Sequence, residues 1–266
     1  MKFSVITVCY NNRDGLEKTI KSVVCQTYKD YEFIVIDGGS KDGTKELLEQ
    51  YDDQIDFWCS EPDKGIYNAM NKGVTQANGD YAIFMNSGDV FYQNNTLETI
   101  ANLNTDADII TGNVNRMDND MPLRFHHKSM FEQIYHETIN HQGSFIKLAL
   151  LKKFPYEEKN LKIVSDWKFW IDSIIFDNAS FYRTDTIVAK QDMTGVSQNS
   201  EIVQQERKVV LDSFFPPLLQ EELLNYYNLN NSSMIKNLIY IKEQKPRIFI
   251  FLRKFTSLIF RLINYT

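Results

Sequence analysis

The sequence predicts an α/β protein in which a doubly wound, mostly parallel sheet carries helices on both faces and is followed by a C-terminal helical extension. Three observations support this prediction. Residues 1–112 alternate strand-like apolar segments with segments of helical spacing, which is typical of a parallel sheet. Polar clusters follow three of the strand-like segments. Residues 197–228 have the pattern of one long helix or two, interrupted at Pro216 and Pro217.

The elements are expected in the following order. Strands are predicted where apolar and β-branched residues run together, over residues 3–8, 31–36, 55–59, 80–85 and 108–112. Helices are predicted where apolar residues recur three or four positions apart, over residues 16–25, 45–51, 65–77 and 97–103. The pattern is less regular after residue 112; short strands are expected near 123–126, 143–146 and 181–188, and a helix over 163–176.

Composition and charge exclude several classes of protein. A chain of 266 residues can bury a core without disulfides or a structural metal. Its 43% hydrophobic and 24% charged residues are globular values and argue against overall disorder. The net charge of −6 disfavours nonspecific binding to nucleic acid. The three cysteines (Cys9, Cys25 and Cys59) are widely spaced, which argues against a disulfide framework or a zinc site.

The N-terminus and the hydropathy profile predict a cytoplasmic protein. Residues 1–8 lead directly into a strand-like segment, without the charged and apolar regions of a signal peptide. An uncharged apolar run of 18 residues, as a spanning helix requires, does not occur in the sequence.

The three polar clusters, at residues 9–13, 37–43 and 86–89, are the first functional signal. In doubly wound sheets the ligand-binding loops lie beyond the carboxyl ends of the strands. Asp37 can present a carboxylate to a base or a ribose, and Gly38 lets the backbone approach a ligand. The sequence has no GxGxxG and no P-loop motif. A pyrophosphate could instead be held through a divalent cation, and Asp89 lies where such an ion is needed.

Several segments, in this order along the chain, resemble the family 2 glycosyltransferases, which have the GT-A fold. The resemblance covers about residues 3–190 and is carried by SVITVCYN (4–11), SVVCQTY (22–28), EFIVIDGGSKDGT (32–44), GIYNAMNKG (65–73), ANGDY (77–81), FMNSGD (84–89), HQGSF (141–145) and SDW (165–167). It implies an inverting glycosyltransferase that moves a sugar from a nucleotide-sugar, expected to be a UDP-sugar, to a saccharide or lipid-linked acceptor in the synthesis of a surface polysaccharide.

The resemblance also implies a domain division and a set of site residues. Residues 1–195 would be the catalytic domain, with a nucleotide-sugar half (1–112) and an acceptor half (113–195), and residues 196–266 the helical extension. The implied nucleotide-binding residues are Thr7, Tyr10, Asn11, Asp37, Gly38, Asp63, Lys64, Asn86 and Ser87. The implied acceptor residues are His141, Gln142 and Trp167.

Asp89 is the expected ligand of a Mn²⁺ or Mg²⁺ ion. Residues 86–89 occupy the position of the family's metal motif, which usually contains two or three acids. Here Asn86 and Gly88 leave Asp89 as the one carboxylate of the motif. Such a site should hold the metal weakly until the donor diphosphate adds its own oxygen ligands.

Asp166 is the expected general base, which would deprotonate the acceptor hydroxyl as it attacks the anomeric carbon. Structural interpretations stay open beside the functional ones. Asp37 could cap a helix beginning near Lys41, and Asp89 could be a turn residue. Asp166 could be an acid favoured at a helix N-terminus, with Asp172 and Asp177 as rival bases. His141 and Gln142 could be a buried polar pair.

The C-terminal tail differs in charge from the rest of the chain. Residues 236–266 contain seven cations and one acid, a net charge of +6 that leaves −12 for residues 1–235. Arg247, Lys254 and Arg261 recur every seven residues, within about 40° of one another on a helix, beside a broad apolar face. This pattern favours peripheral contact with an anionic membrane surface over a helix that docks on the catalytic domain or pairs with another chain.

Two alternative functions remain. A nucleotidyltransferase can share the alternating sheet and a metal-binding carboxylate, but its glycine- and lysine-rich first loop is not found at residues 9–13. A non-catalytic nucleotide-sugar-binding protein would keep Asp37 and would not need Asp166. The sequence does not identify the sugar, the acceptor or the oligomeric state.

Overall fold

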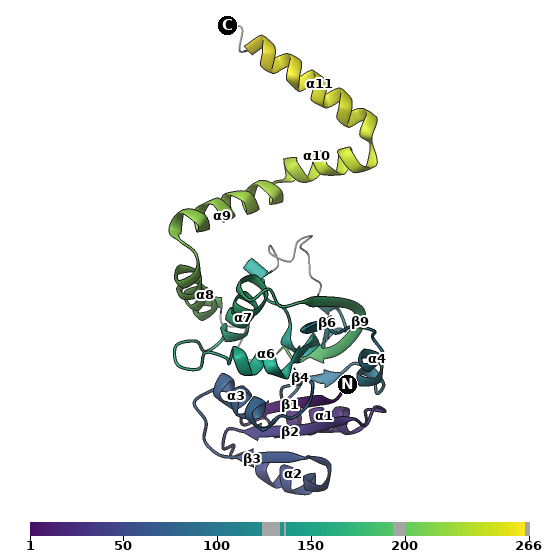
Figure 1. The fold of residues 1–266 in the computed structure, drawn as a ribbon, viewed down its shortest axis with the longest axis vertical. Coiled ribbons are helices and arrows are strands. Elements are labelled where there is room, and N and C mark those ends of the chain that lie inside the picture. Colours follow the sequence, from purple (N-terminus) through teal and green to yellow (C-terminus); the bar gives the residue numbers. More distant parts are fainter. Residues whose placement is uncertain (124–133, 136, 194–199, 264–266) are drawn as a thin grey trace. The chain divides into compact units, whose positions relative to one another are not determined.

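The computed structural model describes residues 1–123, 134–135, 137–193 and 200–263. The chain forms two compact units, Met1–Arg207 and Lys208–Thr266. The strands all belong to the first unit as far as the structure describes it, and the second unit is helical (Figure 1).

Four parallel strands form the first half of the sheet. In spatial order they are β3 (Phe57–Ser60), β2 (Tyr31–Asp37), β1 (Phe3–Cys9) and β4 (Tyr81–Phe84). All seven residues of β1 are buried, as expected for a parallel strand that is covered on both faces. The strands predicted over residues 3–8, 31–36, 55–59 and 80–85 are confirmed, although β3 begins only at Phe57.

The second half of the sheet is mixed. β8 (Ser144–Lys147) lies between β4 and β6 (Ile109–Arg116) and is antiparallel to both. β9 (Phe181–Gln191) is parallel to β6, while the two-residue strands β5 (Val90–Phe91) and β7 (Pro122–Leu123) pair antiparallel with β9 and β6.

The strand predicted over 108–112 is therefore separated from β4 by an antiparallel strand that arrives from later in the chain. Antiparallel neighbours need no helical crossover, which explains why the helix pattern becomes irregular after residue 112. Of the strand expected at 123–126, the part beyond Leu123 lies outside the described residues.

Helices cover both faces of the parallel half, so the predicted fold class is confirmed. One core joins α1 (Arg13–Val24), α2 (Thr44–Gln50) and α4 (Thr96–Ala101) to Phe3 and Val5 of β1. Successive strand residues point to opposite faces, and Ile6 packs on α3 (Ile66–Gln76) across the sheet. Gly73 of α3 lies so close to Ile6 that a Cβ atom there would collide with it.

The mixed half of the sheet contains further helices that connect its strands. A 3₁₀ turn, η2 (His141–Gly143), precedes β8, and α6 (Leu148–Lys153), which was not predicted, follows it. α7 (Ser165–Trp170) continues into a π-helix, η3 (Ile171–Phe176), so the helix predicted over 163–176 is confirmed from Ser165 onward. A 3₁₀ turn, η1 (Asp52–Gln54), follows α2.

The C-terminal helices are α8 (Ser200–Phe214), α9 (Pro217–Asn231), α10 (Ser233–Gln244) and α11 (Pro246–Ile263). The predicted interruption at the two prolines is confirmed, since α8 ends before them and α9 begins with Pro217, where a missing N–H costs nothing. α10 was not predicted; Ser232 begins it by accepting a hydrogen bond from the Ile235 amide at 3.2 Å.

The loops after β1, β2 and β4 meet at one edge of the sheet. The Ser87 amide donates to the Val8 carbonyl at 3.0 Å, and the Gly38 amide donates to the Cys9 carbonyl at 2.9 Å. The Asn12 side chain donates to the Ser87 carbonyl at 3.1 Å. These bonds join the three polar clusters of the sequence into one surface, where the parallel fold places ligand loops.

Candidate functional site

An exposed aromatic ring and a carboxylate lie side by side on this surface. Tyr10 is 66% exposed. A Cβ atom at Gly38 would lie 3.2 Å from the Tyr10 ring and 2.6 Å from Oδ2 of Asp63, so a larger residue at position 38 would displace the Asp63 side chain. Asp63 is anchored through Oδ1, which accepts the Gly65 amide at 2.8 Å. A planar base can stack on such a ring while a sugar hydroxyl donates to the carboxylate.

Asn11 and Lys64 flank this pair. Asn11 has a left-handed backbone (φ 48°), and its side chain accepts the Lys41 amide at 2.9 Å. Its own amide donates to the Ser40 hydroxyl at 2.7 Å, so Asn11 fixes the loop after β1 to the loop after β2. Lys64 is exposed and directly follows Asp63 in the chain, which leaves a cation at the rim of the surface.

The Asp37 carboxylate lies beneath the surface and organises the loop after β2. It is fully buried and accepts hydrogen bonds from the Ser40 amide at 3.0 Å, from the Ser40 hydroxyl, and from the Ser60 hydroxyl at 2.6 Å. α2 begins only at Thr44, so Asp37 is not a helix cap. Its bonds bind the end of β2 to the end of β3.

Two side chains that the sequence predicted to contact a ligand are buried in the core instead. Thr7 is fully buried, and its hydroxyl donates to the Met85 carbonyl at 2.7 Å. Trp167 is 2% exposed, and its indole N–H donates to the Ile134 carbonyl. The structure therefore brings neither side chain to the open surface: the Thr7 hydroxyl and the Trp167 indole hold their own strand and helix in place.

The turn Asn86–Asp89 is held from below by Thr19 of α1. The Thr19 hydroxyl accepts the Gly88 amide at 3.0 Å and donates to the Asp89 carbonyl at 2.7 Å. The Asp89 amide closes the turn on the Asn86 carbonyl at 2.9 Å. Ser87 accepts the Asn12 side chain, so it links this turn to the loop after β1.

Asp89 is a buried acid with few polar neighbours. It is 4% exposed, and burial raises the pKa of its carboxyl to about 6. Its Oδ1 accepts the Asp192 amide at 2.8 Å, and hydrogen bonding to Gln142 acts against the rise of the pKa. Asp192 supplies a second carboxylate, since a Cβ atom at Gly88 would lie 2.6 Å from its Oδ2.

The oxygen atoms at this turn are of the type that a hard divalent cation prefers as ligands. Asp89 and Asp192 offer carboxylate oxygens, and Oδ1 of Asn86 is buried without a hydrogen-bond partner among the described residues. Mn²⁺ and Mg²⁺ take such oxygens and complete their coordination with phosphate. The described residues contain no cluster of three or more His, Cys, Asp or Glu side chains able to hold a metal.

Asp166 lies in the first turn of α7 and faces His141. Its Oδ1 accepts the Trp167 amide at 2.8 Å and lies 3.1 Å from the Tyr67 hydroxyl. Its Oδ2 lies 3.5 Å from Nδ1 of His141. The Asp166 and His141 side chains are 13% and 16% exposed, so the carboxylate can be reached by a small group such as a hydroxyl.

His141 connects this acid to the turn at the sheet edge. Its Nε2 lies 3.2 Å from the side-chain nitrogen of Asn86. Because an amide nitrogen only donates, Nε2 accepts and the proton of the neutral ring lies on Nδ1, toward Asp166. A polar chain thus runs from Asn86 through His141 to Asp166 and Tyr67.

The two acids that were considered as alternative bases each form an ion pair with a lysine. Asp172 pairs with Lys168 at 2.6 Å, and Asp177 pairs with Lys153 at 2.5 Å. Tyr67 and Asp192 were not predicted as site residues. Tyr67 stands within the quoted segment 65–73, but its contact with Asp166 spans 99 positions. Asp192 directly follows β9, and a polar residue after a strand was the signal that could have identified it.

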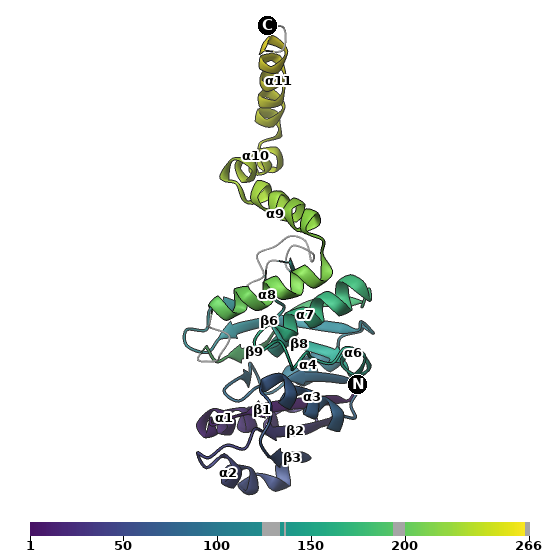
Figure 2. The same ribbon diagram turned by 90° about the vertical axis from the view of Figure 1, so that its left-hand side faces the viewer.

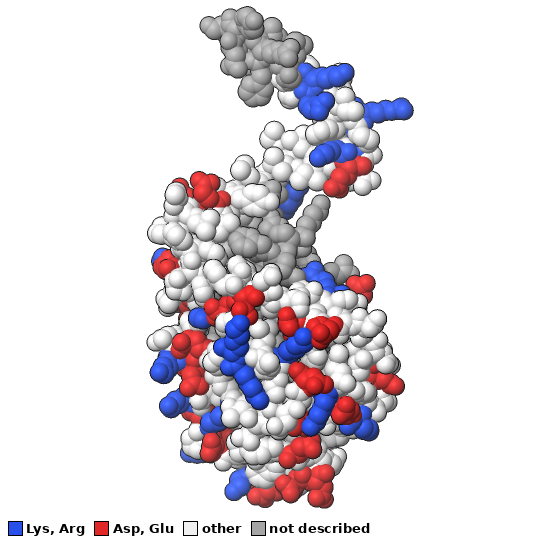
Figure 3. Space-filling view, in the orientation of Figure 1, with Lys and Arg blue, Asp and Glu red and all other residues white. Residues whose placement is uncertain are grey.

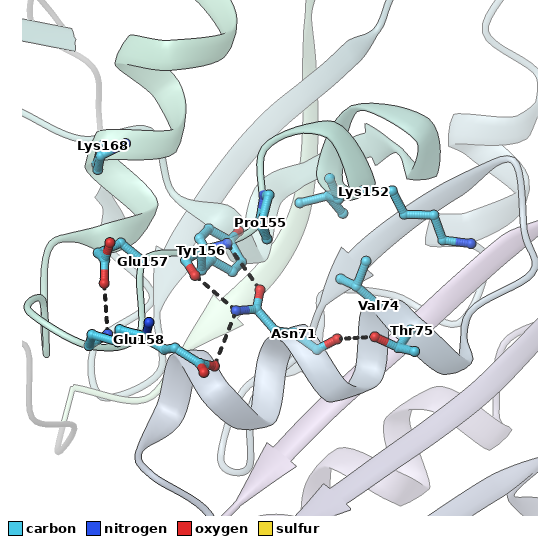
Figure 4. Close-up of a pocket in the computed structure, with 11 residues that line it drawn as sticks. Asn71, Val74, Thr75, Lys152, Pro155, Tyr156, Glu157, Glu158 and Lys168 are labelled. Atoms are coloured by element: carbon cyan, nitrogen blue, oxygen red, sulfur yellow. Dashed lines mark hydrogen bonds between the residues drawn. The ribbon is translucent and has the colours of Figure 1, made fainter.

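One pocket is lined by Tyr156, whose ring packs against Tyr67 of the site (Figure 4). It has a volume of about 580 Å³ and is bounded by α3, α6, α7 and the loop before α7. None of the candidate site residues lines it. The Asn71 side chain stabilises one wall of the pocket. It donates a hydrogen bond to the Tyr156 carbonyl at 2.8 Å and accepts one from the Tyr156 amide at 3.0 Å.

Comparison with known proteins gives a consistent family match. The family model for Glycosyl transferase family 2 matches residues 4–166. A putative teichuronic acid biosynthesis glycosyltransferase of Bacillus subtilis, TuaG, is 40% identical over 89 residues, or 32% of this chain and 35% of that protein. The chain matches only about a third of the length of the first curated relatives.

Solved structures show the same fold at low sequence identity. Staphylococcus aureus TarS 1–349, in complex with UDP-GlcNAc, has a TM-score of 0.64 and 20% identity, covering 94% of this chain and 79% of that one. The mannosyltransferase PcManGT of Pyrobaculum calidifontis, in complex with GDP-Man and Mn²⁺, has a TM-score of 0.57 and 15% identity, covering 97% of this chain and 80% of that one.

Thr19→Val should destabilise the protein, because it leaves the buried Gly88 amide without its acceptor. We expect a loss of about 1–3 kcal/mol in the free energy of unfolding, measured by urea denaturation. Thr19→Ser keeps the hydroxyl and should retain most of that energy. Equal free energies for Thr19→Val and the unmodified protein would show that the turn does not depend on this residue.

Proposed function

The chain belongs to glycosyl transferase family 2, and from that premise we propose that it transfers a sugar from a UDP-sugar to a hydroxyl of a saccharide or lipid-linked acceptor. The observation that carries the proposal is the polar chain from Asn86 through His141 to Asp166. It links the turn suited to a metal and a diphosphate to a carboxylate that an acceptor hydroxyl can reach. In this proposal residues 1–112 bind the donor and residues 113–195 the acceptor.

The donor's nucleoside would lie on the surface around Tyr10 and Asp63. The exposed Tyr10 ring offers a face to the base, and Oδ2 of Asp63 offers an acceptor to the ribose. Asp37 would act through the loop that it holds. Lys64 would balance charge on the diphosphate. A uridine nucleotide is favoured because TarS, which shares the fold, binds UDP-GlcNAc.

A divalent cation would be held by Asp89, with the Asp192 carboxylate and Oδ1 of the Asn86 side chain as further ligands. When bound, the cation supplies positive charge that stabilises the departing diphosphate. The proposal is supported by the hard oxygen donors of this turn and by the Mn²⁺ in the structure of PcManGT.

Asp166 would act as the general base in a single displacement. Oδ2 of Asp166 accepts the proton of the acceptor hydroxyl while its oxygen forms a bond to the anomeric carbon. The bond from that carbon to the diphosphate breaks, and its electron pair leaves with the diphosphate. Because the attack comes from the face opposite the leaving group, the anomeric configuration inverts. The proton of His141 Nδ1 faces the same carboxylate and would hold it in position.

The acceptor class follows from a relative and from the tail. TuaG carries a name that places it in teichuronic acid synthesis, which supports a surface polysaccharide as the product. α11 exposes Ile248, Phe251 and Phe255 at 47%, 66% and 51%. Figure 3 shows cationic side chains gathered on α10 and α11. Peripheral contact with an anionic lipid surface, on the cytoplasmic side, would bring the enzyme to a lipid-linked acceptor.

Among the described helices, none combines the length and the apolar character needed to cross a bilayer. α11 has the cations and the exposed apolar side chains of a helix that lies in the interface plane.

Asp166→Asn should abolish sugar transfer and leave donor binding nearly intact, because the amide cannot accept the proton. We expect a fall of at least about 100-fold in UDP release, measured with a panel of UDP-sugars in the presence of Mn²⁺. Asp172→Asn, on the same helical segment, is the matched control and should retain activity. Substantial turnover by Asp166→Asn would remove this residue from the role of base.

Asp89→Ala should remove the metal-dependent part of donor binding. In the unmodified protein, the correct UDP-sugar at about 100 Kd with Mn²⁺ should add about 2.7 kcal/mol to the apparent stability, seen as a thermal shift. Asp89→Ala should lose this shift while its melting temperature without ligand stays measurable. An unchanged calorimetric affinity with Mn²⁺ present would contradict the assignment.

The pH dependence of metal binding provides a second test of Asp89. Because burial raises the pKa of its carboxyl to about 6, the metal must displace a proton below that pH. The apparent affinity for Mn²⁺ should therefore fall about tenfold per pH unit below pH 6 and level off above it. A pH-independent affinity between pH 5 and 6 would argue against Asp89 as the ligand.

Deletion of residues 247–266 should release the protein from vesicles of phosphatidylcholine and phosphatidylglycerol. Without the cations and apolar face of α11, co-sedimentation should drop to the level seen with neutral vesicles. Lys236→Gln removes a single cation outside α11 and is the matched control. Equal co-sedimentation of the deleted and complete chains would refute the membrane role of the tail.

A further inference from the structure

A buried carboxylate on α8 binds the backbone that leads into α7. Glu206 is 9% exposed. Its Oε1 accepts the Lys162 amide at 2.7 Å, and its Oε2 accepts the Ile163 and Val164 amides at 2.9 and 3.1 Å. Three successive backbone N–H groups thus converge on one side chain from a residue more than 40 positions away. Hydrogen bonds to an ionised acceptor are about twice as strong as neutral ones.

The segment held by Glu206 borders the proposed base. Ser165 begins α7 directly after it, and Asp166 follows. The Tyr67 hydroxyl lies between the Ile163 carbonyl and Oδ1 of Asp166. A shift of residues 162–164 would therefore move both the backbone of Asp166 and the tyrosine that contacts its carboxylate.

The neighbouring residue Arg207 contacts Trp167, the residue that directly follows Asp166. Its guanidinium lies 4.2 Å from the centre of the Trp167 ring, and it donates to the carbonyls of Tyr135 and Glu137 at 3.2 and 3.0 Å. Burial lowers the pKa of Arg207, while the nearby charge of Asp166 acts in the opposite direction. The part of α8 that carries Glu206 and Arg207 belongs to the first unit and lies beside α7 in Figures 1 and 2, so adjacent residues of one helix contact the chain before and after Asp166.

We propose that Glu206 is a positioning residue for sugar transfer: by binding the amides of residues 162–164, it fixes the start of α7 and with it the direction of the Asp166 carboxylate. This inference rests on the proposed role of Asp166 as the base. A misplacement of about 1 Å in a catalytic group can cost about 100-fold in rate. A loop without side-chain support would allow such a displacement, whereas three bonds to one carboxylate oppose it.

Glu206→Gln tests the proposal, because the amide turns an N–H₂ group toward backbone donors and cannot accept all three bonds. We expect kcat for UDP release from the active UDP-sugar to fall about 10- to 100-fold, while the KM for the donor stays within about twofold. Glu201→Gln makes the same change at an exposed position of α8. It is the matched control and should leave both constants unchanged.

A double-mutant cycle separates positioning from general stabilisation. If Glu206 acts through Asp166, then Glu206→Gln should cause no further loss of rate in an Asp166→Asn background, within about twofold. Should Glu206→Gln fail to fold, Glu206→Asp keeps the charge, withdraws its oxygens by one methylene and serves in the same cycle.

Two results would overturn the proposal. One is a kcat of Glu206→Gln equal to that of Glu201→Gln. The other is an equal factor of loss with and without the Asp166 carboxylate, which would assign Glu206 to the fold alone. If the unmodified protein releases no UDP from any UDP-sugar, the proposed function itself is wrong. If the enzyme is active but the double-mutant cycle gives the unexpected result, only the positioning role of Glu206 is wrong.

Discussion

The position of β1 between two parallel neighbours is the constraint on which the rest of the protein depends. β1 pairs in register with β2 on one side and β4 on the other, and all its residues are buried. A one-residue slip would exchange the side chains that pack beneath α1, α2 and α4 with those that pack beneath α3, and neither set would fit its new surroundings. The register therefore fixes where each strand ends, and the loops that carry Tyr10, Asp37 and Asn86 begin at those ends. The surface proposed to bind the donor follows from this sheet.

The proposed acceptor side is assembled in a different way. His141 belongs to a 3₁₀ turn before an antiparallel strand, and Asp166 to the first turn of a helix. Their contact, and the contacts of Tyr67 and Glu206 with the same region, join segments from 25 to 99 positions apart. Hydrogen bonds and close contacts between polar side chains, rather than strand pairing, hold these residues together. A single lost bond is therefore expected to disturb this side more than the donor side, whose loops are cross-linked several times.

The sequence predicted the parallel half of the sheet well because the information for its strands is local. Apolar runs of strand length followed by polar clusters identify parallel strands and their ligand edge directly. The antiparallel β8 between β4 and β6 could not be predicted, because strand order depends on pairing between distant segments. The sequence also did not show which side chains of a motif are buried. Trp167 directly follows Asp166 in the chain and yet faces the core. Neighbours in sequence on a helix point in different directions, so a motif locates a site without assigning each of its residues.

Two acids of the proposed site differ in their surroundings, and the difference matches their proposed roles. Asp89 is buried, and its raised pKa means that its charge is costly without a cation nearby. A cation that arrives with a diphosphate removes this cost, so binding of metal and donor should be coupled. Asp166 is partly exposed and keeps an oxygen directed at His141, away from its backbone hydrogen bond. An acid that must take a proton needs such access, whereas an acid that must hold a metal gains from exclusion of water. The difference in burial thus supports the different tasks that we propose for the two carboxylates.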